Sequence, residues 1–359
     1  MFLCLFRLTA MMHTPNATLT AVAAGSSLER ATVFANTFTS MQEEVTPGLP
    51  PVEAHDSYAK IAARDDVDIV YVGTVNTTHF EASMMLIQAG KNVLIEKPVG
   101  VNATEAKALK VAAVENKVFL MEGMWTRFFP SVEKVKSVIE SGEIGKIVAV
   151  HADFGFQCND PETSRMFDLN LAGGGLLDIG IYPLAFASLA FAGNMPTSIK
   201  SLGTKHAVTG ADTSGSITCL YDNSMVQDKE TGGDQPGLAV ITYNLRGFTP
   251  EETTIVGTKG RVLVKGPAHV STSIVVTKPD GREGTIESKF DFPLPNVNGK
   301  PLHYPRSEGF VYEVKHVQDC LAQGLLESPL YTHQEMVNIS ETMQQARDQM
   351  GVVYPADAM

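Results

Sequence analysis

The sequence predicts an α/β fold: a Rossmann-type, doubly wound parallel sheet, followed by an α+β domain with an open, mostly antiparallel sheet. The first part of the chain alternates continuous apolar runs with helical patterns, which is typical of βαβ units in a parallel sheet covered on both faces. In the second part apolar and polar residues alternate, which indicates half-buried antiparallel strands. The pattern changes near Trp125, so we place the domains at residues 1–126 and 127–359.

In the first part, each apolar run is followed by a helical segment with a recognisable start or stop. Ser26 and Ser27 can cap the helix after the first run, and Gly90 ends the next helix. Asn102 and Glu105 form a plausible capping box for a third helix. The predicted strands are 18–24, 68–74, 92–96 and 118–124, and the predicted helices run to about Phe38, over 80–89, and to about Asn116.

The second part begins with a helix at 130–141, which Gly142 ends. Runs of alternating residues follow, and a turn at 258–260 joins two of them. Two helical patterns close the sequence. The predicted strands are 146–156, 213–221, 237–245, 253–256, 261–265 and 273–277, and the last helices cover about 307–323 and 333–350.

Charge and composition exclude several classes of function. The 359 residues have a formal net charge of −12 and no basic run, whereas a nucleic-acid partner requires clustered Lys and Arg. No stretch reaches the ~18 uninterrupted apolar residues of a membrane helix, and the apolar opening lacks the basic region of a signal peptide. The four cysteines form no C-x-x-C pair, so we expect thiols in a reducing cytoplasm and no metal site.

The tripeptide Glu96-Lys97-Pro98 ends the strand at 92–96. A lysine at the carboxyl end of a buried parallel strand points into the ligand crevice, where its ammonium can hold ribose hydroxyls and lower the pKa of a nearby acid. Pro98 would fix the turn that aims it. The competing interpretation is a lysine that reaches solvent, and the tripeptide alone favours that interpretation.

A second segment, 171–182, places three consecutive glycines at a predicted helix start. Glycines let the backbone approach a ligand, and a helix start offers free amides. Asp178 and Tyr182 are four residues apart and share one helical face, where a carboxylate and a phenol can hold one substrate diol. The competing interpretation is a glycine hinge before a capped helix with Tyr182 in the core, and the segment alone does not choose between them.

Together the two segments resemble the signatures of the Gfo/Idh/MocA oxidoreductase family, an E-K-P strand end and a later G-G-G-x-x-x-D-x-x-x-H helix. Tyr182 stands where that pattern has His. This substitution and the run 119–130 are similar to the family's branch of dimeric dihydrodiol dehydrogenases and D-xylose 1-dehydrogenases. The resemblance extends from about Thr9 to the C-terminus. It implies a homodimer, formed through the outer face of the second domain's sheet.

The resemblance also implies roles for the site residues. Tyr182 would be the general base that oxidises a hydroxyl of a small cyclic substrate, and Lys97 would lower its pKa from the ordinary ~10. Deprotonation would let the carbon pass hydride to nicotinamide. Asp178 would hold the neighbouring hydroxyl. Trp125 and Phe154 look like the apolar wall for a ring, and with equal weight like plain core aromatics.

The same resemblance places His79 in the crevice, although a solvated histidine at a helix start fits the sequence nearly as well. Thr74, Glu96 and Lys97 complete the cofactor-binding residues expected beside it. Arg127 is either a substrate ligand or a structural residue, and the sequence does not choose.

The end of the strand at 18–24 favours NADP over NAD. An NAD site usually has an acidic residue there, on the ribose 2′-hydroxyl. Here Ser26 and Ser27 follow the strand, with Arg30 one turn on. Hydroxyls, helix-start amides and an arginine suit a 2′-phosphate. The competing interpretation is a capped, solvated helix start.

A dinucleotide fold also needs a G-x-G-x-x-G loop after its first strand, roughly 20 residues before that point. The first glycine here is Gly25, and 5–14 resemble the helix that normally follows the loop. Strand one and the glycine loop are therefore expected to be missing. Either the sequence starts at the wrong place, which we favour because the other site residues are present, or this is a truncated form with weak or no cofactor binding.

Two functions from different classes follow. The first is an NADP-dependent dehydrogenase for a vicinal trans-diol or an aldopyranose such as D-xylose. The second is a non-catalytic binding or sensor protein on the same fold, because the glycine loop is absent. Any substrate finer than a small polyol rests on family analogy.

Overall fold

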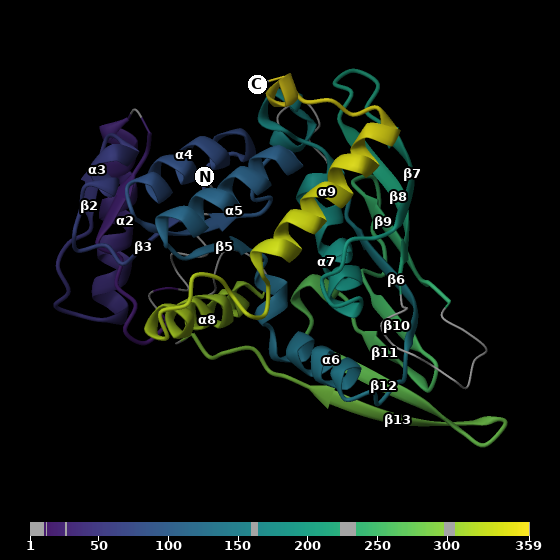
Figure 1. Cartoon of the computed structure of the whole chain (residues 1–359). Helices are drawn as coiled ribbons and strands as arrows, with labels where there is room; N and C mark the ends of the chain where they lie inside the picture. Colours follow the sequence, from purple (N-terminus) through teal and green to yellow (C-terminus); the bar gives the residue numbers. More distant parts are fainter. Residues whose placement is uncertain are drawn as a thin grey trace. The chain divides into compact units, whose positions relative to one another are not determined.

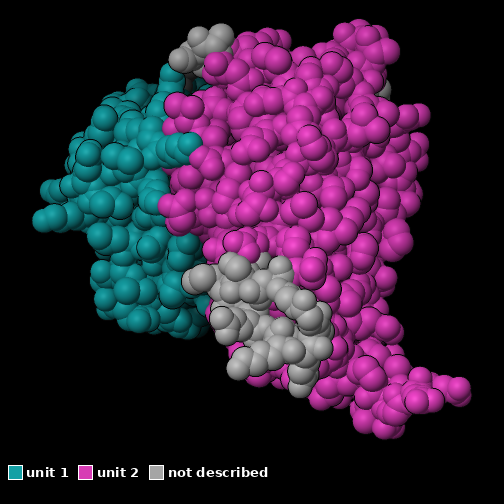
Figure 2. Space-filling view, turned by 45° about the vertical axis from the view of Figure 1, so that its right-hand side comes forward, with its two compact units in different colours: residues 1–99, 107–125, 294–333 teal, residues 100–106, 126–293, 334–359 magenta. Residues whose placement is uncertain are grey.

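The computed structural model describes residues 11, 13–25, 27–158, 164–222, 235–297 and 306–358. Ser26, an expected cofactor residue, lies outside them. The chain forms two compact units, shown in teal and magenta in Figure 2. Unit 1 comprises Met1–Val99, Lys107–Trp125 and Leu294–His333, and unit 2 comprises Gly100–Ala106, Thr126–Pro293 and Gln334–Met359. By contact, 294–333 therefore fall in unit 1, although the sequence pattern places them in the second domain.

Unit 1 contains two small parallel sheets (Figure 1). One pairs β1 (Ala21–Ala23) with β2 (Glu53–His55), and the other has the order β3 (Ile69–Val72), β4 (Asn92–Glu96) and β5 (Leu120–Gly123). The helices are α2 (Leu28–Val45), α3 (Tyr58–Ala62), α4 (His79–Gln88), α5 (Ala103–Asn116), which starts in unit 2, and α8 (Phe310–Ala322). Parallel strands alternating with helices confirm the predicted Rossmann-type sheet.

The local sequence explains these elements. In β4, residues 93–95 are at most 6% exposed, as expected for an apolar run buried on both faces. The Ser27 side chain caps α2 by accepting the N–H of Arg30 at 3.2 Å, and Gly90 adopts φ +77° just after α4. The sequence analysis missed β2 and α3, because three and five residues are too short to show a period.

Unit 2 is built on one eight-stranded sheet with the order β13-β12-β11-β10-β6-β9-β8-β7. Neighbouring strands are antiparallel except β6 and β9, which confirms the mostly antiparallel prediction. The sequence analysis missed the edge strands β7 and β13, because few apolar residues mark their alternate positions. The strands are β6 (Ile147–Gly155), β7 (Ser198–Lys205), β8 (Asp212–Tyr221), β9 (Gly237–Asn244), β10 (Thr253–Gly257), β11 (Gly260–Val264), β12 (Ser273–Asp280) and β13 (Gly284–Asp291), and the main helices are α6 (Pro130–Glu140), α7 (Ile181–Ala190) and α9 (His333–Met350).

The core helix of unit 2 is α7, which packs on β6 (Figure 1). A short π-helical stretch, Leu176–Gly180, leads into it, and every residue of α7 is buried. The stretch Leu169–Ala190 is long and apolar enough to cross a membrane, yet 94% of its apolar window is buried inside the protein. Complete burial is what an all-apolar helix in a protein core shows.

Candidate active site

In unit 1, the carboxyl end of β4 is a polar turn buried in the protein. Lys97 is only 6% exposed, which excludes the lysine that reaches solvent. The Glu96 carboxylate accepts the Tyr71 hydroxyl at 2.6 Å through Oε1 and the Lys97 N–H at 3.1 Å through Oε2. The Lys97–Pro98 peptide bond is cis. Side-chain hydrogen bonds therefore hold the turn that carries Lys97.

Glu122 of β5 supports the same turn, a role that the sequence analysis missed. Its Oε1 accepts the N–H of Val99 at 2.6 Å, and its Oε2 accepts the Tyr331 hydroxyl at 2.6 Å. Burial raises the pKa of Glu122 to about 7, against the lowering effect of these hydrogen bonds and of the Lys97 charge. One feature of the sequence could have indicated this role, namely an acidic residue inside the apolar run 118–124. A carboxylate in a buried strand requires hydrogen-bond partners.

His79, at the start of α4, is buried and connects two strand ends. Its Nδ1 lies 2.7 Å from the carbonyl oxygen of Pro98, and its Nε2 lies 3.1 Å from that of Thr74. Burial lowers the pKa of the ring. An exposure of 1% excludes the solvated histidine. The ring thus ties the end of β3 to the turn after β4.

The segment after β1 carries the residues expected to prefer a 2′-phosphate. Gly25 adopts φ +58°, a left-handed conformation that suits glycine, and the Ser27 cap follows it. Gly25, Arg30 and Thr74 line one cleft. The described residues therefore include a hydroxyl, a helix start and a guanidinium at the place where the sequence predicts them, and no acidic residue stands among 18–25.

That cleft separates the two parallel sheets of unit 1. It has a volume of about 460 Å³, and 18–25 line one wall while 69–75 line the other. In a doubly wound sheet the strand that carries the glycine loop occupies this position. The described residues supply neither this strand nor its glycine loop, so they do not form a cradle for the pyrophosphate of a dinucleotide.

In unit 2, the protein's own groups cover the glycines of 171–182. A Cβ atom on Gly174 would lie 2.1 Å from Asp212 Oδ1, and one on Gly175 would lie 2.8 Å from the Tyr243 ring. The other oxygen of Asp212 accepts the N–H of Leu176 at 2.7 Å. The glycines therefore allow close packing at the helix start. This geometry favours the hinge interpretation over the approach of a ligand.

Asp178 and Tyr182 lie about one turn apart on the helical segment that follows. Asp178 Oδ1 is 2.7 Å from Nη2 of Arg165, an ion pair that the sequence analysis missed. The Asp178 side chain is 12% exposed and that of Arg165 36%, so the pair lies at the boundary with solvent. Arg165 fixes the orientation of the carboxylate. No sequence signal pointed to Arg165, because it lies 13 residues away outside the motif.

The Tyr182 ring packs in an aromatic cluster. Its centroid lies 5.6 Å from that of Phe154 and 5.3 Å from that of His269, and the Phe154 and His269 rings stack at 4.3 Å. Glu251 Oε2 lies 3.7 Å from His269 Nδ1. Burial, followed by the charge of Asp153, raises the pKa of Glu251 to about 7. Phe154 and His269 therefore form the wall that positions the Tyr182 ring.

Two residues with open roles, Arg127 and Trp125, are buried. In unit 2, Arg127 Nη1 lies 2.7 Å from Glu335 Oε1 and donates to the Ala185 carbonyl at 3.1 Å. The Arg127 side chain is only 4% exposed, so the structural interpretation holds. In unit 1, Trp125 is 3% exposed, and its ring stacks on Phe310 at 3.9 Å. One face of Trp125 is therefore covered by the protein itself.

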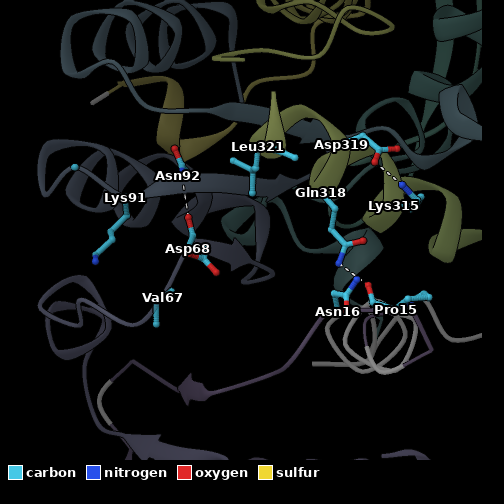
Figure 3. A pocket seen from close by; sticks show the side chains of 12 residues that line it. Pro15, Asn16, Val67, Asp68, Lys91, Asn92, Lys315, Gln318, Asp319 and Leu321 are labelled. Carbon is cyan, nitrogen blue, oxygen red and sulfur yellow. Dashed lines mark hydrogen bonds and ion pairs between the residues drawn. The ribbon is translucent and has the colours of Figure 1, made fainter. Parts of the chain in front are cut away.

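A pocket of about 710 Å³ in unit 1 lies away from these residues (Figure 3). Asp68 and Asn92, at the amino-terminal starts of β3 and β4, line it together with Lys315 and Gln318 of α8. Doubly wound sheets bind ligands at the carboxyl ends of their strands, so this pocket is not the cofactor site. Among the described residues, no group of three or more His, Cys, Asp or Glu side chains could hold a metal ion.

Comparison with known proteins decides the family. Residues 5–124 match the model of the GFO/IDH/MocA oxidoreductase family with its NAD-binding Rossmann fold, and 132–263 match the GFO/IDH/MocA C-terminal domain. A trans-1,2-dihydrobenzene-1,2-diol dehydrogenase from Bos taurus is 35% identical over 305 residues, which cover 85% of this chain and 84% of the relative. The chain belongs to the GFO/IDH/MocA oxidoreductase family. The Homo sapiens dehydrogenase of the same name is also 35% identical over 305 residues, with the same coverage.

Solved structures share the GFO/IDH/MocA fold. A 3-ketoreductase from Actinomadura kijaniata, in complex with NADP and TDP-benzene, is 21% identical with a TM-score of 0.74 and covers 97% of this chain and 94% of its own. A levoglucosan dehydrogenase, in complex with NADH and levoglucosan, is 17% identical with a TM-score of 0.76 and the same coverage. At these identities the likeness shows the fold alone. It confirms the predicted fold, a Rossmann-type parallel sheet and a mostly antiparallel sheet that follows it.

Proposed function

We propose that the chain is an NADP-dependent dehydrogenase that oxidises a hydroxyl of a small cyclic substrate, either a trans-dihydrodiol or an aldopyranose such as D-xylose. The observation that carries the proposal is 35% identity, over 85% of the chain, to relatives named trans-1,2-dihydrobenzene-1,2-diol dehydrogenase. The buried Lys97 after β4 in unit 1 and the packed Tyr182 ring in unit 2 agree with it, because each side chain is held in place within its own unit.

In this proposal Tyr182 is the acid/base. Its phenolate takes the proton of the substrate hydroxyl, and we expect the Lys97 ammonium to favour the phenolate. Asp178 accepts a hydrogen bond from the neighbouring hydroxyl of the substrate, and Arg165 keeps the Asp178 carboxylate oriented. Phe154 supplies apolar surface beside Tyr182, and Trp125 is the second proposed wall.

The preference for NADP rests on the segment after β1. A 2′-phosphate suits this segment, which offers Ser27, Arg30 and the start of α2. Residues 18–25 include no carboxylate that could accept a hydrogen bond from the ribose 2′-hydroxyl of NAD. Thr74, His79, Glu96 and Lys97 are the other cofactor residues that we propose. When bound, the nicotinamide supplies the hydride acceptor. Arg30→Ala is expected to weaken NADPH binding and to leave NADH binding unchanged.

The test is Tyr182→Phe. NADPH formation is followed by its absorbance with a trans-dihydrodiol and with D-xylose as substrates. We expect kcat to fall roughly 10²- to 10⁴-fold, the usual contribution of a general base. The matched control is Tyr221→Phe, because Tyr221 is 2% exposed and its ring stacks on Phe191 at 4.2 Å in the same unit. An unchanged kcat in Tyr182→Phe would contradict the proposed acid/base.

A second candidate function, a non-catalytic binding protein on the same fold, is favoured by one observation. The described residues supply no pyrophosphate cradle beside the cleft of unit 1. Turnover of either substrate by the chain as printed would rule this candidate out. Saturable binding of substrate without turnover, under conditions in which the fold is intact, would support it.

We also propose a homodimer that uses the outer face of the unit 2 sheet. On β7 and β8 this face carries the apolar side chains of Leu202 and Leu220, which are 80% and 36% exposed. Exposed apolar residues on adjacent strands are common at protein interfaces. Light scattering of Leu202→Asp should give a monomer where the parent chain gives a dimer, and a parent monomer would overturn the proposal.

A further inference from the structure

Unit 2 has a pocket that the proposed reaction does not use. Its volume is about 430 Å³, within the range of small-molecule sites. The lining residues come from the segments that follow β6 and β9, from the end of β7 and the loop to β8, from β8 itself, and from a short helix at 165–167. Among the residues that the structure describes, those that line it are Gln157, Cys158, Phe167, Lys205, His206, Ala207, Thr213, Leu245 and Arg246, and none of these is Asp or Glu.

The buried part of the lining is held in place by the fold. Phe167, Thr213 and Leu245 are at most 5% exposed. The Cys158 N–H donates to the Leu245 carbonyl at 2.9 Å, which joins the segment after β6 to the segment after β9. The pocket is therefore preformed, as small-molecule sites usually are.

The exposed part of the lining carries two permanent cations. Gln157 and Arg246 pair as an isolated antiparallel bridge, which fixes the backbone of Arg246 beside the segment after β6. Within the described part of the chain, no carboxylate forms an ion pair with the Arg246 guanidinium. Lys205 Nζ donates to the Gly351 carbonyl at 2.9 Å, and its other ammonium protons remain available to a ligand.

His206 adds a directed donor to these two cations. The Thr209 N–H donates to His206 Nδ1 at 3.3 Å, so the neutral ring carries its proton on Nε2. The ring packs edge-on against Phe167 with a centroid distance of 5.2 Å, and the His206 N–H donates to the Ala211 carbonyl at 2.7 Å. Both contacts fix the orientation of the imidazole.

We propose that this pocket binds the phosphate group of a small molecule. The lining brings together a guanidinium, an ammonium and an imidazole from two separate segments, in a chain whose formal net charge is −12. Positive charge is therefore concentrated here against the charge of the whole protein. The site lies outside the residues proposed for the dehydrogenase reaction, so it adds a ligand to that function.

Phosphate fits this set of donors better than a carboxylate does. A phosphate monoester presents three acceptor oxygens and a charge of about −1.5 to −2 at pH 7, whereas a carboxylate presents two oxygens and one charge. The fork of Arg246 matches two phosphate oxygens, which leaves the third for Lys205 or His206. The phosphate can come from the free ion or from a phosphorylated metabolite, and the volume of the pocket leaves room for a carbon skeleton.

The experiment is isothermal titration calorimetry of the full chain with inorganic phosphate and with glycerol 3-phosphate. We expect saturable binding of both, no binding of glycerol, and binding of D-glycerate that is at least tenfold weaker. Tighter binding of glycerol 3-phosphate would identify a phosphate ester as the ligand, and equal affinities would identify the free ion. Both results support the site, whereas equal affinity for D-glycerate would contradict the assignment to phosphate.

Arg246→Gln should weaken the binding of both phosphates at least tenfold, and circular dichroism checks that the variant is folded. Two control variants should change the affinity less than twofold. Arg261→Gln removes an exposed arginine of β11 that does not line the pocket. Arg30→Gln removes the arginine of unit 1 that is proposed for the 2′-phosphate of NADP.

Three outcomes would overturn the proposal. The folded parent chain does not bind either phosphate. Arg261→Gln weakens binding as much as Arg246→Gln does, so that the affinity reflects general attraction to positive charge. Arg30→Gln abolishes binding while Arg246→Gln preserves it, so that the phosphate occupies the segment after β1. Because the measurement records binding without turnover, a failure of the proposed dehydrogenase reaction would leave this result unaffected.

Discussion

Unit 2 contains one continuous sheet, whereas the described strands of unit 1 form two separate sheets. In unit 2, eight strands pair without a break, and the inner side chains of β6 lie under the buried helix α7. In unit 1, a cleft of about 460 Å³ divides the five described strands into two groups. The family match nevertheless covers both units. Helix caps and apolar strand patterns are therefore recognisable in the sequence of unit 1, although its sheet is interrupted.

The two units also hold their buried charges differently. In unit 2, Arg127 and Glu335 form a closed pair whose members are 4% and 8% exposed. In unit 1, Glu122 is 1% exposed, and its hydrogen bonds come from a backbone amide and a phenol. Burial raises the pKa of Glu122 to about 7 despite the charge of Lys97, so this carboxyl titrates in the ordinary pH range.

The largest expected effect is on the closed pair of unit 2. Arg127→Met leaves the Glu335 carboxylate buried without its cation, so we expect the free energy of unfolding to fall by about 3–5 kcal/mol. Urea denaturation measures the loss. The specific activity of the folded variant should equal that of the parent, because Arg127 is buried and holds Glu335 and the Ala185 carbonyl.

The control for this prediction is Lys60→Met in unit 1. Lys60 pairs with Asp56, the two side chains are 58% and 42% exposed, and such surface pairs contribute about 0–1 kcal/mol. Equal losses of unfolding free energy in the two variants would contradict the expected difference between the buried pair of unit 2 and the exposed pair of unit 1. A selective loss of kcat in Arg127→Met would return Arg127 to the substrate site.

The next largest expected effect is a pH dependence of the free energy of unfolding that comes from Glu122 in unit 1. The pKa of Glu122 is about 7 in the folded chain, above its ordinary value, so the folded state holds the proton more tightly than the unfolded state. This contribution to stability is complete below the ordinary pKa of Glu and is lost as the pH rises through 7, with a total of about 3 kcal/mol. Glu122→Gln cannot titrate and should lose this part of the pH dependence.

Urea denaturation of both proteins at pH 5 and pH 8 measures the difference. The half-buried Glu251 of unit 2 also has a pKa of about 7 and is present in both proteins, so it cancels in the comparison. A parallel pH dependence in the parent and in Glu122→Gln would contradict the role assigned to Glu122. The activity of Glu122→Gln then shows whether the turn that carries Lys97 requires the charged carboxylate of residue 122 or only a side chain of the same shape.

The smallest effect concerns the helix start after β1. Ser27→Ala removes the side chain that accepts the Arg30 N–H, and we expect a loss of about 1 kcal/mol in the free energy of unfolding. Ser57→Ala is the matched control, because Ser57 precedes α3 without a capping side-chain hydrogen bond. Thermal denaturation of the two variants should separate them. Identical melting temperatures would show that the Ser27 cap does not stabilise unit 1.

The sequence predicted those features that depend on neighbours along the chain. The β4 run, the Ser27 cap and the buried Lys97 turn follow from residues within a few positions of one another. Asn102 does accept the Glu105 N–H at 3.0 Å, although the Glu105 side chain binds the N–H of Val101 instead of closing the predicted box.

The sequence did not predict contacts between distant segments. The hydrogen bond between Tyr331 and Glu122 spans 209 residues, and no local pattern announces it. The glycines of 171–182 illustrate the same limit, because their need for space comes from Asp212 and Tyr243 on other strands. Edge strands such as β13 are missed for a related reason. Most residues of β13 are exposed on both faces of the strand, so it lacks the apolar alternation that marks a half-buried strand.

The hydrogen bond from Tyr331 to Glu122 has a practical consequence for dissecting the protein. Unit 1 is assembled from three separate stretches, and the last of them, Leu294–His333, carries this phenol. A fragment that stops near Trp125, where the sequence pattern suggests a cut, would contain Glu122 and lack Tyr331. Gene fusions, domain exchanges and nucleotide-binding fragments designed on this chain should therefore be discontinuous and should include residues through His333.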